Sequence, residues 1–122
     1  MKYLMLVQKD EAAYRALSDQ ERADLHERYA AHGRRMVEAG VLRGGAVLDA
    51  TATATTLRLR DSRRLVTDGP FAESSEQIAG VCIIEVADLD EALAWAADHP
   101  DAAWGSVEVR PILGTWDARG PS

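Results

Sequence analysis

The stretch AGVCIIEVADLDEALAWAADHP, residues 79–100, decides the fold because it joins a buried strand directly to a helix. Its first part, AGVCIIEV (79–86), is almost continuously apolar and predicts a central strand that is buried on both faces. Asp88 and Glu91 then have the spacing of a capping box, which marks the start of a helix. Pro100 cannot continue that helix, so the helix is expected to end just before it.

The N-terminal half predicts the same succession of strand, helix and strand. YLMLV (3–7) has the aromatic and aliphatic composition of a strand, and VLRGGAVL (41–48) predicts another. Ser18 and Glu21 form a second capping box, so a helix is expected over residues 19–39.

Further strands lie between and after these two halves. Residues 56–67 alternate apolar and basic side chains around a two-residue break, which predicts a hairpin. SVEVRPI (106–112) alternates as a final strand, and Pro111 is tolerated only near an edge or an end. Gly44 and Gly45 predict a bulge or bend in the second strand.

The element order is therefore βαβ, an inserted hairpin and βαβ again, within one domain that spans residues 1–122. This order predicts an α+β, ferredoxin-like βαββαβ fold with an antiparallel sheet and both helices on one face. A single chain has no helices left to cover the other face. We therefore expect a homodimer, in which a second subunit covers it.

Composition excludes several classes of function. The formal net charge of −6 argues against direct nucleic acid binding, because the phosphates require a basic surface. The N-terminal apolar run is too short for a signal peptide or a membrane span, so we expect a cytoplasmic protein without membrane contact. The single cysteine, Cys82, lies in an apolar run and is interpreted as a core residue of a reducing compartment.

Several stretches of the chain resemble one known family. LVTDGPFAESSEQ (65–77) with VEVRPI (107–112), together with MKYLMLV and TATATTLRLRD upstream, is similar to the DGPF group of YCII-related proteins. The resemblance implies a dimeric α/β barrel built from ferredoxin-like subunits. It implies little about activity, because most members have no assigned reaction.

Some YCII relatives are thought to use a His–Asp pair in a cleft, and one eliminates chloride from a chlorinated aromatic ring. Many DGPF members are encoded beside extracytoplasmic-function sigma factors, which suggests a regulatory role.

His32 is the first candidate for catalysis. It shares one helical stripe with Leu25, Tyr29 and Met36, so it is expected to face the sheet. A histidine there could act as a general base, or it could be a satisfied structural residue. The resemblance places the histidine of catalytic relatives nearer Tyr29, so Tyr29 is included among the substrate-binding candidates.

Asp68 is the candidate partner of His32. In the order Asp68-Gly69-Pro70, the carboxylate could accept amide hydrogens within its own turn, or the rigid turn could direct it into a cleft. Phe71, which follows, is either a core anchor or an aromatic wall for a ligand.

Two further groups complete the candidates. Arg58 and Arg60 share one strand face and could bind a small anionic ligand, although they could equally protect a strand edge from aggregation. His26 is expected on the surface, and His99 at a helix end where an imidazolium would suit the helix dipole. The spacing of the histidines predicts no metal site, and no nucleotide or other cofactor motif is present.

Two functions remain open. The favoured hypothesis is a non-catalytic regulatory or small-ligand-sensing dimer, with a sigma factor as a candidate partner. The alternative is a cofactor-independent lyase or hydrolase in which His32 and Asp68 form an acid–base pair.

Overall fold

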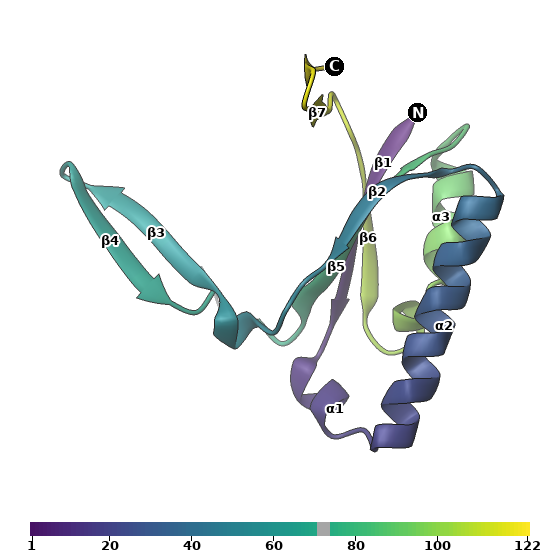
Figure 1. Cartoon of the computed structure of the whole chain (residues 1–122), viewed down its shortest axis with the longest axis horizontal. Coiled ribbons are helices and arrows are strands. Elements are labelled where there is room, and N and C mark those ends of the chain that lie inside the picture. Colours follow the sequence, from purple (N-terminus) through teal and green to yellow (C-terminus); the bar gives the residue numbers. More distant parts are fainter. Residues whose placement is uncertain (71–73) are drawn as a thin grey trace.

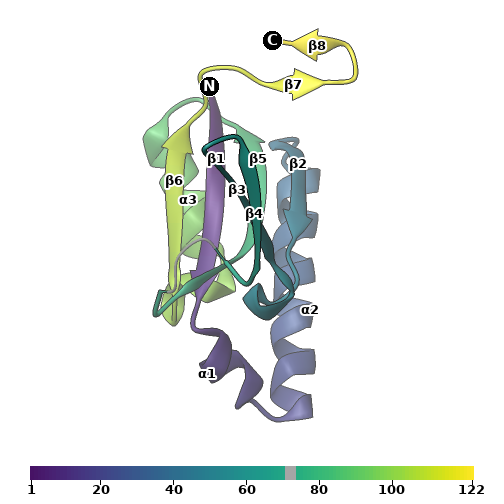
Figure 2. The same ribbon diagram turned by 90° about the vertical axis from the view of Figure 1, so that its left-hand side faces the viewer.

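The computed structural model describes residues 1–70 and 74–122, and its centre is a four-stranded antiparallel sheet with the order β2-β5-β1-β6 (Figures 1 and 2). Its strands are β1 (Lys2–Lys9), β2 (Leu42–Val47), β5 (Gln77–Glu85) and β6 (Ser106–Pro111). With α2 between β1 and β2, and α3 between β5 and β6, the succession is the predicted βαββαβ. The predicted α+β class and antiparallel sheet are confirmed.

The helices α2 (Asp19–Glu38) and α3 (Leu89–Asp98) pack on one face of the sheet (Figure 1). The capping box of α2 is formed as predicted: Ser18 Oγ accepts from the Glu21 amide, and the Glu21 carboxylate accepts from the Ser18 amide. Gly40 follows the helix with φ of 72°, a left-handed conformation that ends it. The short helix α1 (Glu11–Arg15) was not predicted from the sequence.

The core lies between the sheet and the two helices. Along β1, alternate side chains are buried, so that Tyr3, Met5 and Val7 all face the helices. Tyr3 and Met5 belong to the core cluster, which also includes Met36, Val41, Ile84, Val86 and Ala92. The predicted irregularity in β2 is present as a register shift between Leu42 and Gly44.

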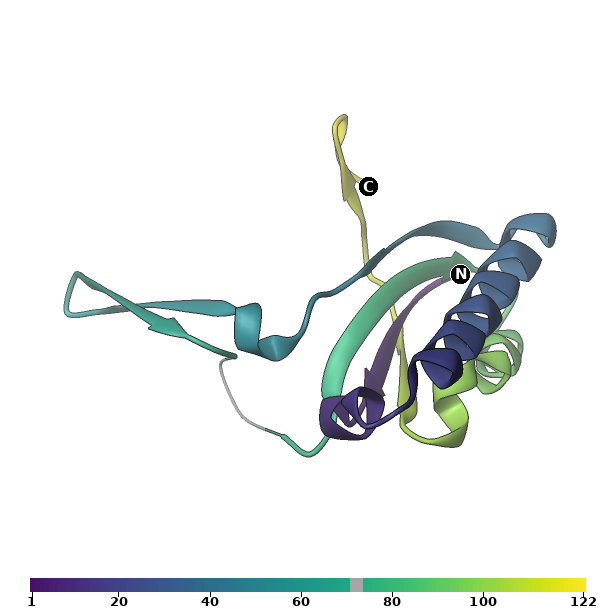
Figure 3. The ribbon, with the colours of Figure 1, turned by 60° about the horizontal axis from the view of Figure 1, so that its bottom comes forward.

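The predicted hairpin consists of β3 (Thr55–Arg60) and β4 (Arg63–Asp68), and it projects away from the four-stranded sheet (Figures 1 and 3). The Asp61-Ser62 turn has positive φ at both positions, as a two-residue hairpin loop requires. Leu57 and Val66 are directly opposite each other, and with Leu59 they form an exposed apolar face of the hairpin. We call these three residues the hairpin apolar face.

The helix-free face of the sheet corrects one prediction. Residues 79–86 were expected to be buried on both faces, but most of β5 is only half-buried. The reason is that the helices cover one face (Figure 2), while the strand register turns Leu4, Leu6 and Ile83 to the other, which no second layer of the described residues covers.

Shorter elements connect and extend this framework. They are the 3-10 turns η1 (Thr51–Thr53) and η2 (Pro100–Ala103), and the C-terminal pair β7 (Trp116–Asp117) and β8 (Gly120–Pro121). Among the described residues, no helix has the length and apolar character to cross a membrane.

Candidate functional site

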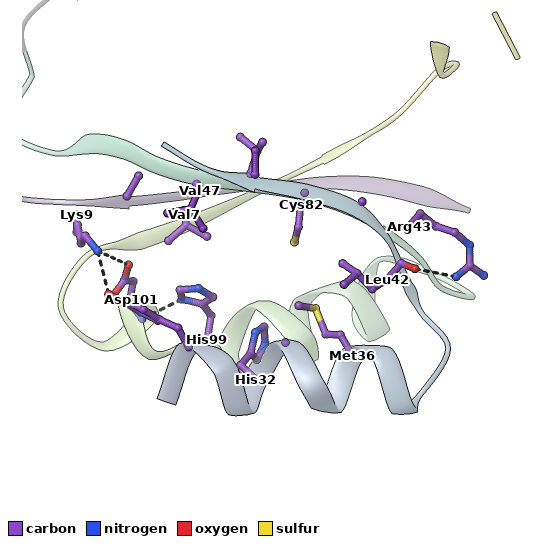
Figure 4. Close-up of a pocket in the computed structure, with 18 residues that line it drawn as sticks. Val7, Lys9, His32, Met36, Leu42, Arg43, Val47, Cys82, His99 and Asp101 are labelled. Atoms are coloured by element: carbon purple, nitrogen blue, oxygen red, sulfur yellow. Dashed lines mark hydrogen bonds and ion pairs between the residues drawn. The ribbon is translucent and has the colours of Figure 1, made fainter. Parts of the chain in front are cut away.

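A cleft of about 670 Å³ opens between α2 and the sheet (Figure 4). Its walls are mainly apolar and come from β1, α2, β2 and β5: Val7, Met36, Leu42, Val47, Val81 and Cys82. One end is different, because four polar side chains gather there: Lys9, Tyr29, His99 and Asp101. We call this group the polar end. A volume of this size is within the usual range for small-molecule sites, which are commonly apolar with a few polar groups.

Lys9 reaches the polar end because it occupies the inward-facing register of β1. Its exposed fraction is 9%, and a lysine buried to this extent usually has a partner. The Nζ atom donates to Tyr29 Oη at 2.9 Å and lies 3.6 Å from Asp101 Oδ2. The ammonium also lies over two aromatic rings, 4.4 Å from the centroid of Tyr14 and 4.9 Å from that of Tyr29.

Asp101 is the most deeply buried charged residue of the site, with an exposed fraction of 1%. Its Oδ1 accepts hydrogen bonds from Tyr29 Oη at 2.5 Å and from Trp104 Nε1 at 2.8 Å. With Lys9 near Oδ2, both carboxylate oxygens have partners, which is what a buried carboxylate needs.

The approach of η2 to the end of β1 depends on Gly105. A Cβ atom at this position would lie 2.1 Å from the carbonyl oxygen of Gln8 and 3.0 Å from Lys9 Cα. The absence of a side chain therefore allows the two backbones to touch, and this contact holds Asp101 beside Lys9.

His99 lies at the junction of α3 and η2, where its Nδ1 accepts the Asp101 amide hydrogen at 3.0 Å. Burial lowers the pKa of the His99 ring to about 4, an effect that Asp101 opposes and that the nearby His32 and Lys9 reinforce. The ring is therefore neutral at pH 7, which corrects the expectation of an imidazolium at the helix end. With Nδ1 acting as an acceptor, the proton of the neutral ring is on Nε2.

His32 faces the sheet from α2 as predicted and is 1% exposed. Its Nε2 lies 2.9 Å from the carbonyl oxygen of Trp95, so Nε2 carries the proton and donates. In the neutral ring this leaves Nδ1 as an acceptor. The rings of His32 and His99 meet edge to face with centroids 5.1 Å apart, and both line the cleft (Figure 4).

Burial also affects two weak acids of the cleft. Burial, followed by the hydrogen bond to Asp101, raises the pKa of the Tyr29 phenol well above its usual range. Burial raises the pKa of the Cys82 thiol as well. Both groups are therefore protonated at neutral pH, and Tyr29 acts as a hydrogen-bond donor to Asp101 and not as a base.

The structure separates the residues that the sequence suggested for the site. Tyr29 and His32 lie in the cleft, whereas Asp68 ends β4 in the hairpin, opposite Thr55, with an exposed side chain. Arg58 and Arg60 lie on one face of β3, as predicted, and within the described residues neither they nor Asp68 line the cleft. Within one chain the cleft therefore contains His32 without Asp68. The pairing of the two residues stays a prediction, which would need Asp68 to come from a second subunit. Phe71 lies outside the described residues.

Sequence reasoning missed Lys9, His99 and Asp101 as cleft residues. The signal for Lys9 was available, because it continues the alternation of Tyr3, Met5 and Val7 on the buried side of β1. A charged residue in such a position needs a buried partner. Nothing in the sequence near Asp101 identified it as that partner, since the pairing depends on the packing of η2 against β1.

Across residues 1–70 and 74–122, no group of three or more acidic, histidine or cysteine side chains could hold a metal ion.

Comparison with known proteins gives two findings. The family model described as the YCII-related domain matches residues 1–116. An uncharacterized protein of Rhizobium meliloti (strain 1021) is 42% identical to the chain over 114 residues, which cover 92% of each sequence. The match includes β1, the helices and the sheet strands that form the cleft.

Proposed function

Because this chain belongs to the YCII-related domain family, whose Rhizobium meliloti relative is described only as uncharacterized, we propose a function from the cleft itself. The protein is a small-ligand-sensing homodimer that binds an organic molecule between α2 and the sheet. The observation that carries this proposal is the 670 Å³ cleft, which combines apolar walls with one polar end.

The partners of the polar groups favour binding over turnover. Asp101 Oδ1 accepts from Tyr29 and Trp104, and Oδ2 faces the Lys9 ammonium, so this carboxylate is held by protein partners and is 1% exposed. Within the described chain, His32 bonds to a backbone carbonyl and His99 accepts from a backbone amide. Neither ring is hydrogen-bonded to a carboxylate there. A carboxylate partner is the usual group that makes a histidine a stronger base, and these contacts do not supply one.

The dimer is the second part of the proposal. The hairpin projects on the helix-free side of the sheet (Figures 1 and 3), where Leu4, Leu6 and Ile83 are half-buried, and it adds the exposed hairpin apolar face. A second ferredoxin-like subunit would cover both surfaces and produce a dimeric α/β barrel. The exposed fractions of Leu57, Leu59 and Val66 are 53%, 63% and 58%, so the described residues of one subunit leave these apolar side chains largely open to solvent.

The output of the sensor is proposed to be a protein contact. The hairpin face opposite to the apolar one contains Arg58, Arg60 and Arg63, with Arg60 and Arg63 directly across from each other. A basic surface on an acidic protein suits an acidic partner, and an extracytoplasmic-function sigma factor is the candidate. Co-purification with such a factor should be lost in the variant Arg58→Glu with Arg60→Glu, and retained binding there would exclude this surface.

The binding proposal is tested by screening small apolar acids, alcohols and ketones for an increase in melting temperature, followed by calorimetric titration. We expect at least one chemical class to bind saturably, with one site per subunit. Gly33 lines the cleft, and a Cβ there would meet no atom within 4 Å, so Gly33→Leu should fold and block binding. Val37→Leu, at an exposed position of the same helix, is the matched control and should bind normally. Binding that is equal in both variants, or no binding by any class, contradicts the proposal.

One observation favours a second function, a cofactor-independent lyase or hydrolase. The Trp95 carbonyl fixes the proton of His32 on Nε2, which leaves Nδ1 as a base beside the Nε2–H donor of His99. In this alternative His32 removes a proton, and Asp68 from a second subunit is its partner. Mass spectrometry of a bound ligand after incubation decides between the two: product that forms with the native protein and not with His32→Gln supports the enzyme.

A further inference from the structure

The polar end offers a ligand mainly hydrogen-bond donors. Asp101, the only carboxylate among the described residues that line the cleft, is 1% exposed and already accepts from Tyr29 and Trp104. Its remaining oxygen faces the Lys9 ammonium at 3.6 Å. A ligand group that needs to donate a hydrogen bond therefore has little to gain from this carboxylate.

Lys9 retains donor capacity at the surface of the cleft. An ammonium has three N–H donors, and the described contacts use one on Tyr29 Oη and one toward Asp101. The rings of Tyr14 and Tyr29 flank the charge without accepting a conventional hydrogen bond through their faces. The third donor remains for a ligand.

His99 supplies a second donor. Since its Nδ1 accepts the Asp101 amide hydrogen, the neutral ring presents Nε2–H. The pKa of His99, lowered to about 4 by burial, keeps the ring in this form at neutral pH. The titratable and charged groups around it are Lys9, Tyr29, His32 and Asp101, and all four belong to the same end of the cleft.

The rest of the cleft balances this polar end with apolar surface. Arg43 is the other cation in the lining, but it lies at the opposite end and is paired with Glu85 at 3.1 Å (Figure 4). Between the two ends the side chains of Val7, Met36 and Cys82 face one another across the cleft (Figure 4). A molecule that fits must be apolar along its length and charged or polar at one end only.

We infer that the cleft binds a compact apolar carboxylate, with its carboxylate oxygens on Lys9 Nζ and His99 Nε2 and its apolar body along Val7, Met36 and Cys82. This inference rests on the proposed ligand-binding function and adds the chemical class of the ligand. A carboxylate has two acceptor oxygens that can meet two neighbouring donors, and its charge complements a cation that is already desolvated.

The test uses the full-length chain and a pair of probes that differ in one group. 2-Naphthoate carries the carboxylate, and 2-naphthalenemethanol is its neutral counterpart of similar size. In calorimetric titrations at about pH 7.5 and constant salt, 2-naphthoate should bind about tenfold or more tightly than the alcohol. Lys9→Met should weaken 2-naphthoate binding on the order of tenfold to a hundredfold and change binding of the alcohol little.

Three further variants keep the result interpretable. Lys9→Arg retains the cation and should retain the preference for the acid. This variant carries the test if Lys9→Met does not fold. His99→Asn keeps an acceptor for the Asp101 amide but removes Nε2–H, and should weaken 2-naphthoate about tenfold. Arg60→Met removes an exposed cation of the hairpin and should have no effect.

The outcomes separate this inference from the proposed function. Equal affinity for both probes, or tighter binding of the alcohol, overturns the carboxylate inference but leaves ligand binding in the cleft intact. Gly33→Leu should abolish binding of 2-naphthoate and Lys9→Met should weaken it. If only Gly33→Leu has its effect, the placement of the carboxylate at Lys9 is wrong. If neither these probes nor any class in the screen binds, the proposed function fails as well.

Discussion

Tyr29 Oη donates a hydrogen bond of 2.5 Å to Asp101 Oδ1, and this contact connects α2 to η2 across 72 positions of sequence. The phenol also accepts from Lys9 at 2.9 Å, so the half-buried Tyr29 is the middle member of a chain of three polar groups. Because the pKa of Tyr29 is raised by burial and by this hydrogen bond, the phenol keeps its proton and organises the other two groups.

The first prediction concerns this phenol. Tyr29→Phe removes the central donor and leaves a buried carboxylate with fewer partners, which should lower the free energy of unfolding by about 1–3 kcal/mol. Urea denaturation followed by circular dichroism measures the change. Tyr14→Phe, which removes an exposed phenol hydrogen-bonded to His26, is the control and should cost less. Equal losses in the two variants would show that the buried network adds nothing.

Lys9 and Asp101 should be energetically coupled. Either Lys9→Met or Asp101→Asn alone leaves a buried charge without its partner and should cost about 3 kcal/mol, whereas the double variant leaves no such charge. A double-mutant cycle of unfolding free energies is therefore expected to give an interaction of about 1 kcal/mol or more. Strict additivity would mean that the 3.6 Å pair makes no net contribution.

His99 should make stability depend on pH in a defined interval. Its pKa is about 4 in the folded chain and 6.5 when unperturbed, so below pH 6.5 the unfolded chain binds a proton that the folded chain does not. Stability from this residue is complete above about pH 6.5 and falls as the pH decreases toward about 4. Partial solvent exposure limits the change to about 1–2 kcal/mol, although the full pKa shift would correspond to about 3.

The comparison that isolates His99 uses two substitutions. His99→Asn removes the titrating ring but keeps an acceptor for the Asp101 amide, so the wild-type curve should approach the variant curve as the pH falls from 6.5 to 4. His99→Ala also removes the acceptor, and should add a constant loss of about 1 kcal/mol at every pH. Parallel curves for wild type and His99→Asn would refute the lowered pKa.

The hairpin apolar face should control assembly. Leu57→Ser with Leu59→Ser removes two exposed apolar side chains from the proposed interface and should weaken dimerisation at least about thirtyfold. Light scattering after size-exclusion chromatography over a range of concentrations measures this change. Arg60→Ser with Arg63→Ser, on the opposite face, is the matched control and should remain dimeric. A wild-type monomer at all concentrations would reject the proposed assembly.

Most of the fold could be predicted from local sequence signals. The capping box of Ser18 and Glu21 located α2, and the Asp61-Ser62 break located the hairpin, because both features depend on residues that are close in sequence. The burial of residues 79–86 was overestimated, because a continuously apolar strand does not reveal which of its faces the helices of its own chain cover.

The candidate site was less predictable. The helical period correctly placed Tyr29 and His32 on the inner face of α2, and the strand period could have placed Lys9 there too. The partner of Lys9 could not be found in this way, because Asp101 reaches it through the contact of Gly105 with Gln8. The lowered pKa of His99 likewise results from burial in the assembled fold and has no signature in neighbouring residues.

The separation of the β3–β4 hairpin from the four-stranded sheet has a consequence for how this chain can diverge. Its two strands pair with each other, and the described hairpin residues contribute nothing to the lining of the cleft. On the roles proposed above, substitutions in the hairpin change what the protein assembles with and leave the cleft unaltered, and substitutions around Lys9 change the ligand and leave the assembly unaltered. Duplicated copies of such a gene could exchange inputs and outputs independently.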